Sequence, residues 1–143
     1  MEVIPTMRKK LFNGLGVLQA FIGVGAVVGG LGLVLDPSGA RLGVPIELLA
    51  ETPFATFLIP GIVLFTVNGL GNLAGAGVSF ARYRYAGEVA TALGAFLVAW
   101  IFVQVYWMSG VHWLHWLYLS LGIVELILGW LVRRTARRRL SNR

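Results

Sequence analysis

Eleven of the twelve lysine and arginine residues lie on one side of four apolar segments, and only Arg41 lies on the other. Basic residues that flank apolar segments stay in the cytoplasm when a chain inserts into a membrane. The pattern therefore predicts four membrane spans with both chain termini in the cytoplasm. The eleven residues are Arg8, Lys9, Lys10, Arg82, Arg84, Arg133, Arg134, Arg137, Arg138, Arg139 and Arg143.

The composition agrees with a membrane protein, because 57% of the 143 residues are hydrophobic. Four spans of about 20 residues each use more than half of such a chain and leave only short connections. We therefore expect a single membrane domain over residues 1–143, of the all-α class: a four-helix antiparallel bundle with both termini inside. Features of organellar targeting are absent from the sequence, so the bacterial cytoplasmic (inner) membrane is the expected location.

The expected spans cover about residues 11–35, 54–80, 87–108 and 111–132, with a basic cytoplasmic tail at 133–143. Asp36-Pro37-Ser38-Gly39 predicts a turn after the first span. The following stretch, Pro45 to Glu51, predicts a short helix in the membrane interface.

Thr52-Pro53 is expected to begin the second span, and Pro60 is expected to kink it by removing a backbone hydrogen bond. Ser109-Gly110 predicts a tight hairpin between the third and fourth spans. The tryptophan and tyrosine residues on both sides of this hairpin predict an aromatic belt at the outer interface.

The net charge of +6 would suggest nucleic acid as a partner for a soluble protein. Here the membrane topology accounts for it, and each basic side chain near anionic headgroups contributes about 1 kcal/mol of attraction. We expect membrane lipids as partners and no nucleic acid. Because the chain is small, a homo-oligomer or another membrane protein is the expected protein partner.

Signatures of enzymes and of cofactor or metal sites are absent from the sequence. The chain has no cysteine, which excludes disulfides and cysteine-ligated metals. His112 and His115 share one helix, whereas a bis-histidine haem takes its ligands from two helices. We expect no enzymatic activity, no cofactor and no metal.

Each span carries one stripe of small and polar residues at helical spacing. Lipid cannot hydrogen-bond these side chains, so we expect the stripes to converge inside the bundle. The stripes are Gly16, Gln19, Gly23, Ala26 and Gly30; Gly61, Asn68, Asn72, Gly75 and Ser79; Gly87, Ala90, Gly94, Leu97 and Gln104; and His115, Tyr118, Gly122, Glu125 and Gly129.

The depth of these residues predicts two polar layers. Gln19, Asn72 and Glu125 each lie about eight residues, or roughly 12 Å, from the cytoplasmic end of their span. Gln104 and His115 are expected in a second layer close to the outer face. Asn68 and Tyr118 lie between the two layers.

Glu125 is the most informative of these residues, because a charged carboxylate inside a membrane costs about 2.5 to 3.5 kcal/mol. Removal from water disfavours the charged form, so we expect the carboxyl group to be neutral at rest. It then has two interpretations. It either donates to Asn72 or Gln19 and fixes the register of the helices, or it carries protons or binds cations in a cavity.

Several short strings resemble a group of small four-span bacterial inner-membrane proteins. They are Leu35 to Gly39, Thr52-Pro-Phe, Leu58 to Gly61, Asn68 to Gly71, and Trp100 to Gln104. In size and layout the chain is also similar to DoxX-like membrane proteins. Small multidrug resistance transporters share the size and a single membrane glutamate, but theirs is in the first span, where this chain has Gln19.

Two function classes follow. The first is a non-enzymatic structural or accessory membrane protein. The alternative is a small proton-coupled transporter or carrier of a hydrophobic or cationic solute, with Gln19, Asn68, Asn72 and Glu125 as its intramembrane polar site. An interior in which Glu125 is buried and hydrogen-bonded favours the first class, and an open cavity that reaches Glu125 favours the second.

Overall fold

A computed structural model describes residues 3–107 and 113–142 and contains only helices, turns and bends within them. The elements are α1 (Val3–Leu35), the 3-10 helices η1 (Ala40–Leu42) and η2 (Ile46–Leu49), α2 (Leu58–Val63), the π-helix η3 (Leu64–Leu70), α3 (Gly71–Phe80), α4 (Ala86–Trp107) and α5 (Trp113–Ser141).

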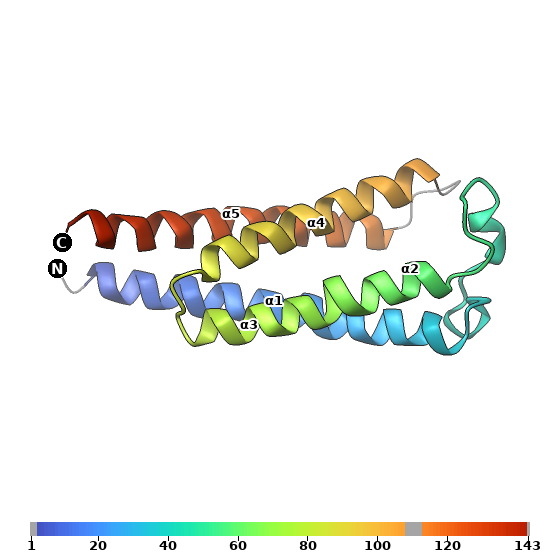
Figure 1. Ribbon diagram of the computed structural model, residues 1–143, viewed down its shortest axis with the longest axis horizontal. Helices are drawn as coiled ribbons and strands as arrows, with labels where there is room; N and C mark the ends of the chain where they lie inside the picture. The colour runs from blue at the N-terminus through green and yellow to red at the C-terminus, as the bar shows by residue number, and fades with distance from the viewer. Residues whose placement is uncertain (1–2, 108–112, 143) are drawn as a thin grey trace.

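Four helices in the described part of the chain are long and apolar enough to cross a membrane: Thr6–Leu35, Leu58–Phe80, Ala86–Trp107 and Trp113–Arg138. The second combines α2, η3 and α3, which follow one another without a break (Figure 1). The protein is thus all-helical, with the helices that a multi-pass membrane protein requires.

The helices pack in two pairs, which are joined by contacts of α1 with α5 and of α3 with α4. α1 lies along α2, η3 and α3, whereas α4 packs against α5, and α1 also contacts α5 (Figure 1). The beginning of α1 and the end of α5 lie at one end of the molecule, and the connection that holds η1 and η2 lies at the other. The basic residues of α1 and α5 therefore share one end, and Arg41 lies at the opposite end.

The surface of the helices is apolar, whereas polar groups lie inside. On α1 the side chains of Val17, Phe21, Val24 and Val28 are 56–63% exposed, while Gln19 between them is fully buried. In water such a surface would drive association, but lipid tails solvate it. This distribution is the one expected for helices that face lipid.

Small residues let the helices approach one another closely. A side-chain Cβ at Gly30 of α1 would lie 2.5 Å from the backbone nitrogen of Phe65 in η3. One at Gly87 of α4 would lie 2.5 Å from the backbone nitrogen of Arg133 in α5. A residue with a Cβ would clash at either position. Such close approach is the packing that glycine allows between membrane helices.

The second span differs from its prediction. Its helix begins at Leu58, not at residue 54, and residues 50–57 are irregular. Pro60 therefore lies in the first turn, where a backbone N–H has no partner within the helix, and it removes no internal hydrogen bond. The irregularity lies instead at η3, where the helix widens over Leu64–Leu70.

The first and fourth helices are longer than predicted. α1 begins at Val3, so Arg8, Lys9 and Lys10 are helical. α5 continues to Ser141, so most of the predicted basic tail is helix, in keeping with the high helix propensity of arginine. The predicted ends at Met108 and Val111, and the Ser109-Gly110 hairpin, lie outside the described residues.

The connection between α1 and α2 holds the predicted turn. The carboxylate of Asp36 accepts hydrogen bonds from the hydroxyl of Ser38 at 2.6 Å and from the backbone nitrogen of Arg41 at 2.8 Å. These hydrogen bonds hold the pKa of Asp36 below its usual value of 3.8, and the bond from the Ser38 hydroxyl has the largest effect. Within the stretch predicted as a short interfacial helix, Pro45 to Glu51, the structure has the 3-10 helix η2. A second 3-10 helix, η1, precedes it and was not predicted.

Candidate functional site

Three helices join through a chain of buried hydrogen bonds. The hydroxyl of Ser79 on α3 donates to Oε1 of Gln19 on α1 at 2.6 Å, and Nε2 of Gln19 donates to Oε1 of Glu125 on α5 at 3.3 Å. All three side chains are 0% exposed. We call these residues the Ser79–Gln19–Glu125 network.

Two apolar clusters enclose this network along the length of the bundle. One contains Phe12 and Leu15 of α1 with Val132 of α5, and the other contains Ile22 of α1 with Leu97 of α4. Gln19 lies between Leu15 and Ile22, so an apolar cluster separates it from each end of the bundle. In such surroundings water does not compete for the hydrogen bonds. If one of these bonds is broken, a buried polar group is left without a partner.

Gly75 on α3 provides the space for the amide of Gln19. A Cβ at this position would lie 2.8 Å from Nε2 of Gln19 and 2.9 Å from Cδ1 of Leu93. Gly75 and Ser79 are one helical turn apart, so the same face of α3 both admits the glutamine and binds it. Their spacing explains how α3 positions this side chain.

Asn68 and Asn72 lie on the same stripe as Gly75 and Ser79 and are also buried, with 1% and 0% exposure. Nδ2 of Asn72 donates to the backbone oxygen of Asn68 at 2.9 Å. This bond stays within the second span and joins η3 to α3. The two asparagines therefore form a local pair, separate from the hydrogen bonds of the Ser79–Gln19–Glu125 network.

Glu125 and the two asparagines together carry four buried side-chain atoms with no hydrogen-bond partner among the described residues: Oε2 of Glu125, Oδ1 of Asn72, and both Oδ1 and Nδ2 of Asn68. Buried polar groups in proteins are nearly always hydrogen-bonded, so these four atoms require an explanation. They retain the capacity to bind a proton, a water molecule or a polar ligand. π-Helices such as η3, which contains Asn68, occur frequently at functional sites.

The predicted outer residues Gln104, His115 and Tyr118 are half-buried. Tyr118 packs against the apolar cluster of Ile22, Leu97 and Ile101, and its hydroxyl lies against Gly25 of α1. Gln104 and Tyr118 take no part in the Ser79–Gln19–Glu125 network. These two outer residues are thus separate from the Ser79–Gln19–Glu125 network.

Two polar contacts were absent from the predicted site. Ser79 was placed on the polar stripe of its span, but its hydrogen bond to Gln19 was not predicted. Its position seven residues after Asn72 was the available signal. The second contact joins Nε of Arg133 to Oε1 of Glu88 at 3.3 Å, between α5 and α4.

Groups of three or more metal-ligating side chains are absent from the part of the chain that the structure describes. His115 lies at the beginning of α5, and His112 lies outside the described residues.

Comparisons of the chain with models of protein families, with curated proteins and with solved structures find no match. The function must therefore be inferred from the side chains themselves.

Proposed function

We propose that this chain is a small non-enzymatic protein of the bacterial cytoplasmic membrane with a structural or accessory role. The observation that carries the proposal is the Ser79–Gln19–Glu125 network, in which Glu125 is 0% exposed and hydrogen-bonded. A buried hydrogen bond between membrane helices fixes their register. In this proposal the polar interior stabilises the helices, whose apolar outer faces contact lipid, a second copy or a partner membrane protein.

The proposed orientation places both termini in the cytoplasm. It rests on the basic residues, since eleven of twelve lie on the side of the chain termini. Because the chain has no cysteine, single introduced cysteines report sidedness directly. Ser38→Cys, at the end opposite the termini, should react with a membrane-impermeant maleimide on intact spheroplasts. The matched variant Ser141→Cys, at the end of α5, should react only after the membrane is opened, and the reverse pattern would contradict the orientation.

Two substitutions of Glu125 test the structural role. Glu125→Gln retains an acceptor for Gln19 and should leave the free energy of unfolding close to that of the original chain. Glu125→Leu leaves Nε2 of Gln19 unpaired and should lower it by about 0.6 to 2 kcal/mol. The measurement is unfolding by sodium dodecyl sulfate in mixed micelles, and an unchanged stability of Glu125→Leu would contradict the role.

A second candidate function is a proton-coupled carrier of a hydrophobic or cationic solute. The specific observation in its favour is that Oε2 of Glu125, Oδ1 of Asn72 and both polar side-chain atoms of Asn68 have no hydrogen-bond partner in the described chain. A carboxyl group with one unused oxygen inside a membrane is suited to taking up and releasing a proton.

The same Glu125→Gln variant separates the two functions. In liposomes with an internal pH dye, a carrier would take up tetraphenylphosphonium, a hydrophobic cation, with countermovement of protons. A Glu125→Gln protein that folds normally but loses this exchange would establish the carrier and overturn the purely structural role. The structural role predicts that the pH-dye signal is the same for liposomes with the original protein, liposomes with the variant and empty liposomes.

A further inference from the structure

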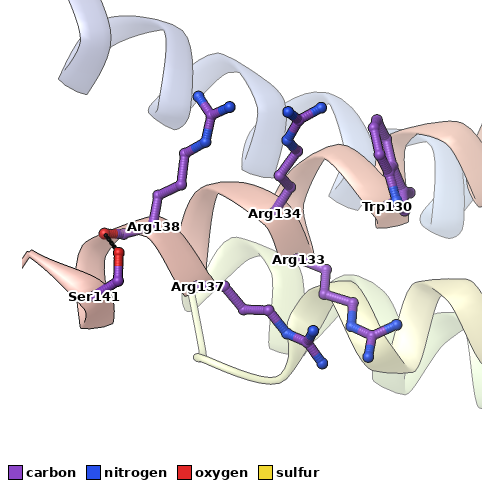
Figure 2. Close-up of a pocket in the computed structure, with 6 residues that line it drawn as sticks. All are labelled: Trp130, Arg133, Arg134, Arg137, Arg138 and Ser141. Atoms are coloured by element: carbon purple, nitrogen blue, oxygen red, sulfur yellow. Dashed lines mark hydrogen bonds between the residues drawn. The ribbon is translucent and has the colours of Figure 1, made fainter.

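A basic pocket of about 470 Å³ lies on the last turns of α5 (Figure 2). It is lined by Trp130, Arg133, Arg134, Arg137, Arg138 and Ser141. The sequence after Glu125 contains no acidic residue, and Glu88 on α4 is engaged with Arg133. The pocket therefore carries an excess of positive charge, which favours an anionic ligand.

Two of these arginines point in one direction. Figure 2 shows the side chains of Arg134 and Arg138 on one side of α5 and those of Arg133 and Arg137 on the other. Residues four apart are neighbours on a helix surface, and like charges at this spacing repel each other. An anion between the two guanidinium groups would replace this repulsion with charge-assisted hydrogen bonds, and arginine is well suited to phosphate.

Trp130 belongs to the same face of α5. The guanidinium group of Arg134 lies over the ring of Trp130, 5.2 Å from its centroid. This contact orients Arg134 and fixes the tryptophan directly next to the basic residues. Tryptophan is enriched where the hydrocarbon of a membrane meets its headgroups, so the face has the composition of that boundary.

An exposed apolar row continues from Trp130 in the opposite direction along α5. Ile123, Ile127 and Trp130 are 44%, 53% and 50% exposed and follow one another at helical spacing. The face therefore presents hydrocarbon first, then an aromatic ring and then two cations. A phospholipid has its acyl chains and phosphate in the same order.

We propose that Trp130, Arg134 and Arg138 bind the phosphodiester headgroup of an anionic phospholipid whose acyl chain lies along Ile123 and Ile127. Basic pockets on membrane helices bind such headgroups. The apolar row favours a phospholipid over free phosphate, because free phosphate has no hydrocarbon chain to contact Ile123 and Ile127. The proposal is independent of the Ser79–Gln19–Glu125 network, because the two sites share no residue.

The test is a lipid titration of the purified full chain in detergent, with native mass spectrometry reporting the dissociation constant of the first bound lipid. The probes are dioleoyl phosphatidylglycerol, dioleoyl phosphatidylcholine and inorganic phosphate. Phosphatidylglycerol should bind most tightly, and millimolar phosphate should not displace it. Arg134→Gln combined with Arg138→Gln should raise the dissociation constant of phosphatidylglycerol about 25-fold. Each arginine is expected to contribute about fivefold, which corresponds to about 1 kcal/mol, and the two factors multiply.

The matched control is Arg82→Gln combined with Arg84→Gln, which removes the same charge from the turn before α4 and leaves the pocket intact. Its dissociation constant should change less than fivefold, and Trp130→Leu should give an intermediate loss. Circular dichroism checks that every variant is helical. Equal weakening by both arginine pairs, equal affinity for the two lipids, or displacement of the lipid by inorganic phosphate would each overturn the proposal.

Discussion

Nε2 of Gln19 donates to Oε1 of Glu125 across 3.3 Å, although 106 positions separate the two residues. This hydrogen bond joins the first helix of the chain to the last. Because the hydroxyl of Ser79 donates to the other end of the same amide, Gln19 holds both partners at once. A single glutamine thus couples α1, α3 and α5 in surroundings where water cannot replace either bond.

Ser79→Ala should lower the free energy of unfolding by about 0.6 kcal/mol, the average for a hydrogen bond between membrane helices. The change leaves Oε1 of Gln19 without its donor. The matched control is Ser120→Ala, because the exposed hydroxyl of Ser120 bonds only to the backbone of its own helix at Trp116. Detergent unfolding of both variants checks the prediction, and equal losses would indicate that the bond between α3 and α1 contributes nothing.

Gly75→Ala should destabilise the protein by about 1 to 3 kcal/mol, as overpacking of a filled interior does. The new methyl group would lie 2.8 Å from Nε2 of Gln19. Gly77→Ala is the control on the same helix, because a Cβ there meets nothing within 4 Å. The control should be neutral or more stable, since alanine has the higher helix propensity. A Gly75→Ala protein as stable as Gly77→Ala would contradict the described packing of Gln19.

The turn at Asp36 should depend on pH in a defined direction. Its hydrogen bonds hold the pKa of Asp36 below 3.8 in the folded protein, so the charged form stabilises the turn. This stabilisation is complete above the unfolded pKa and is lost as the pH falls through the folded one, which is below 3.8. Ser38→Ala removes the largest cause of the shift and should raise the pKa of Asp36 toward its usual value. Carbon-13 NMR titration of the carboxyl group measures both proteins, and an unchanged pKa in Ser38→Ala would contradict the assignment.

The spacing of polar residues within apolar segments predicted the burial of the inner polar side chains, whereas Gln104, His115 and Tyr118, predicted inside the bundle by the same pattern, are half-buried. Gln19, Asn68, Asn72 and Glu125 are all buried, because a helix presents every third or fourth residue on one face and lipid excludes unpaired polar groups. The partner of Glu125 could not be chosen in the same way. Gln19 and Asn72 were equal candidates by depth, and the rotation of each helix, which decides between them, depends on packing with its neighbours.

The remaining differences have local causes. Gly30 of α1 lies against Phe65 within the π-helix η3. This is a contact between helices, and the residue pattern within the second span predicted neither the contact nor the π-helix. Helix ends were also missed, since the apolar pattern stops at Val132 whereas the backbone of α5 stays helical to Ser141. Apolar periodicity marks the length that lies in lipid, and arginine-rich turns can continue a helix beyond it.

The most direct test of the proposed structural role is a double-mutant cycle between Gln19 and Glu125. The cycle compares the free energies of unfolding of the original chain, Gln19→Leu, Glu125→Leu and the double variant. If the hydrogen bond stabilises the bundle, the two changes together will cost less than the sum of the single ones, with a coupling of about 0.6 to 1.7 kcal/mol. Strict additivity of the two substitutions would contradict a stabilising contact between α1 and α5 at this site.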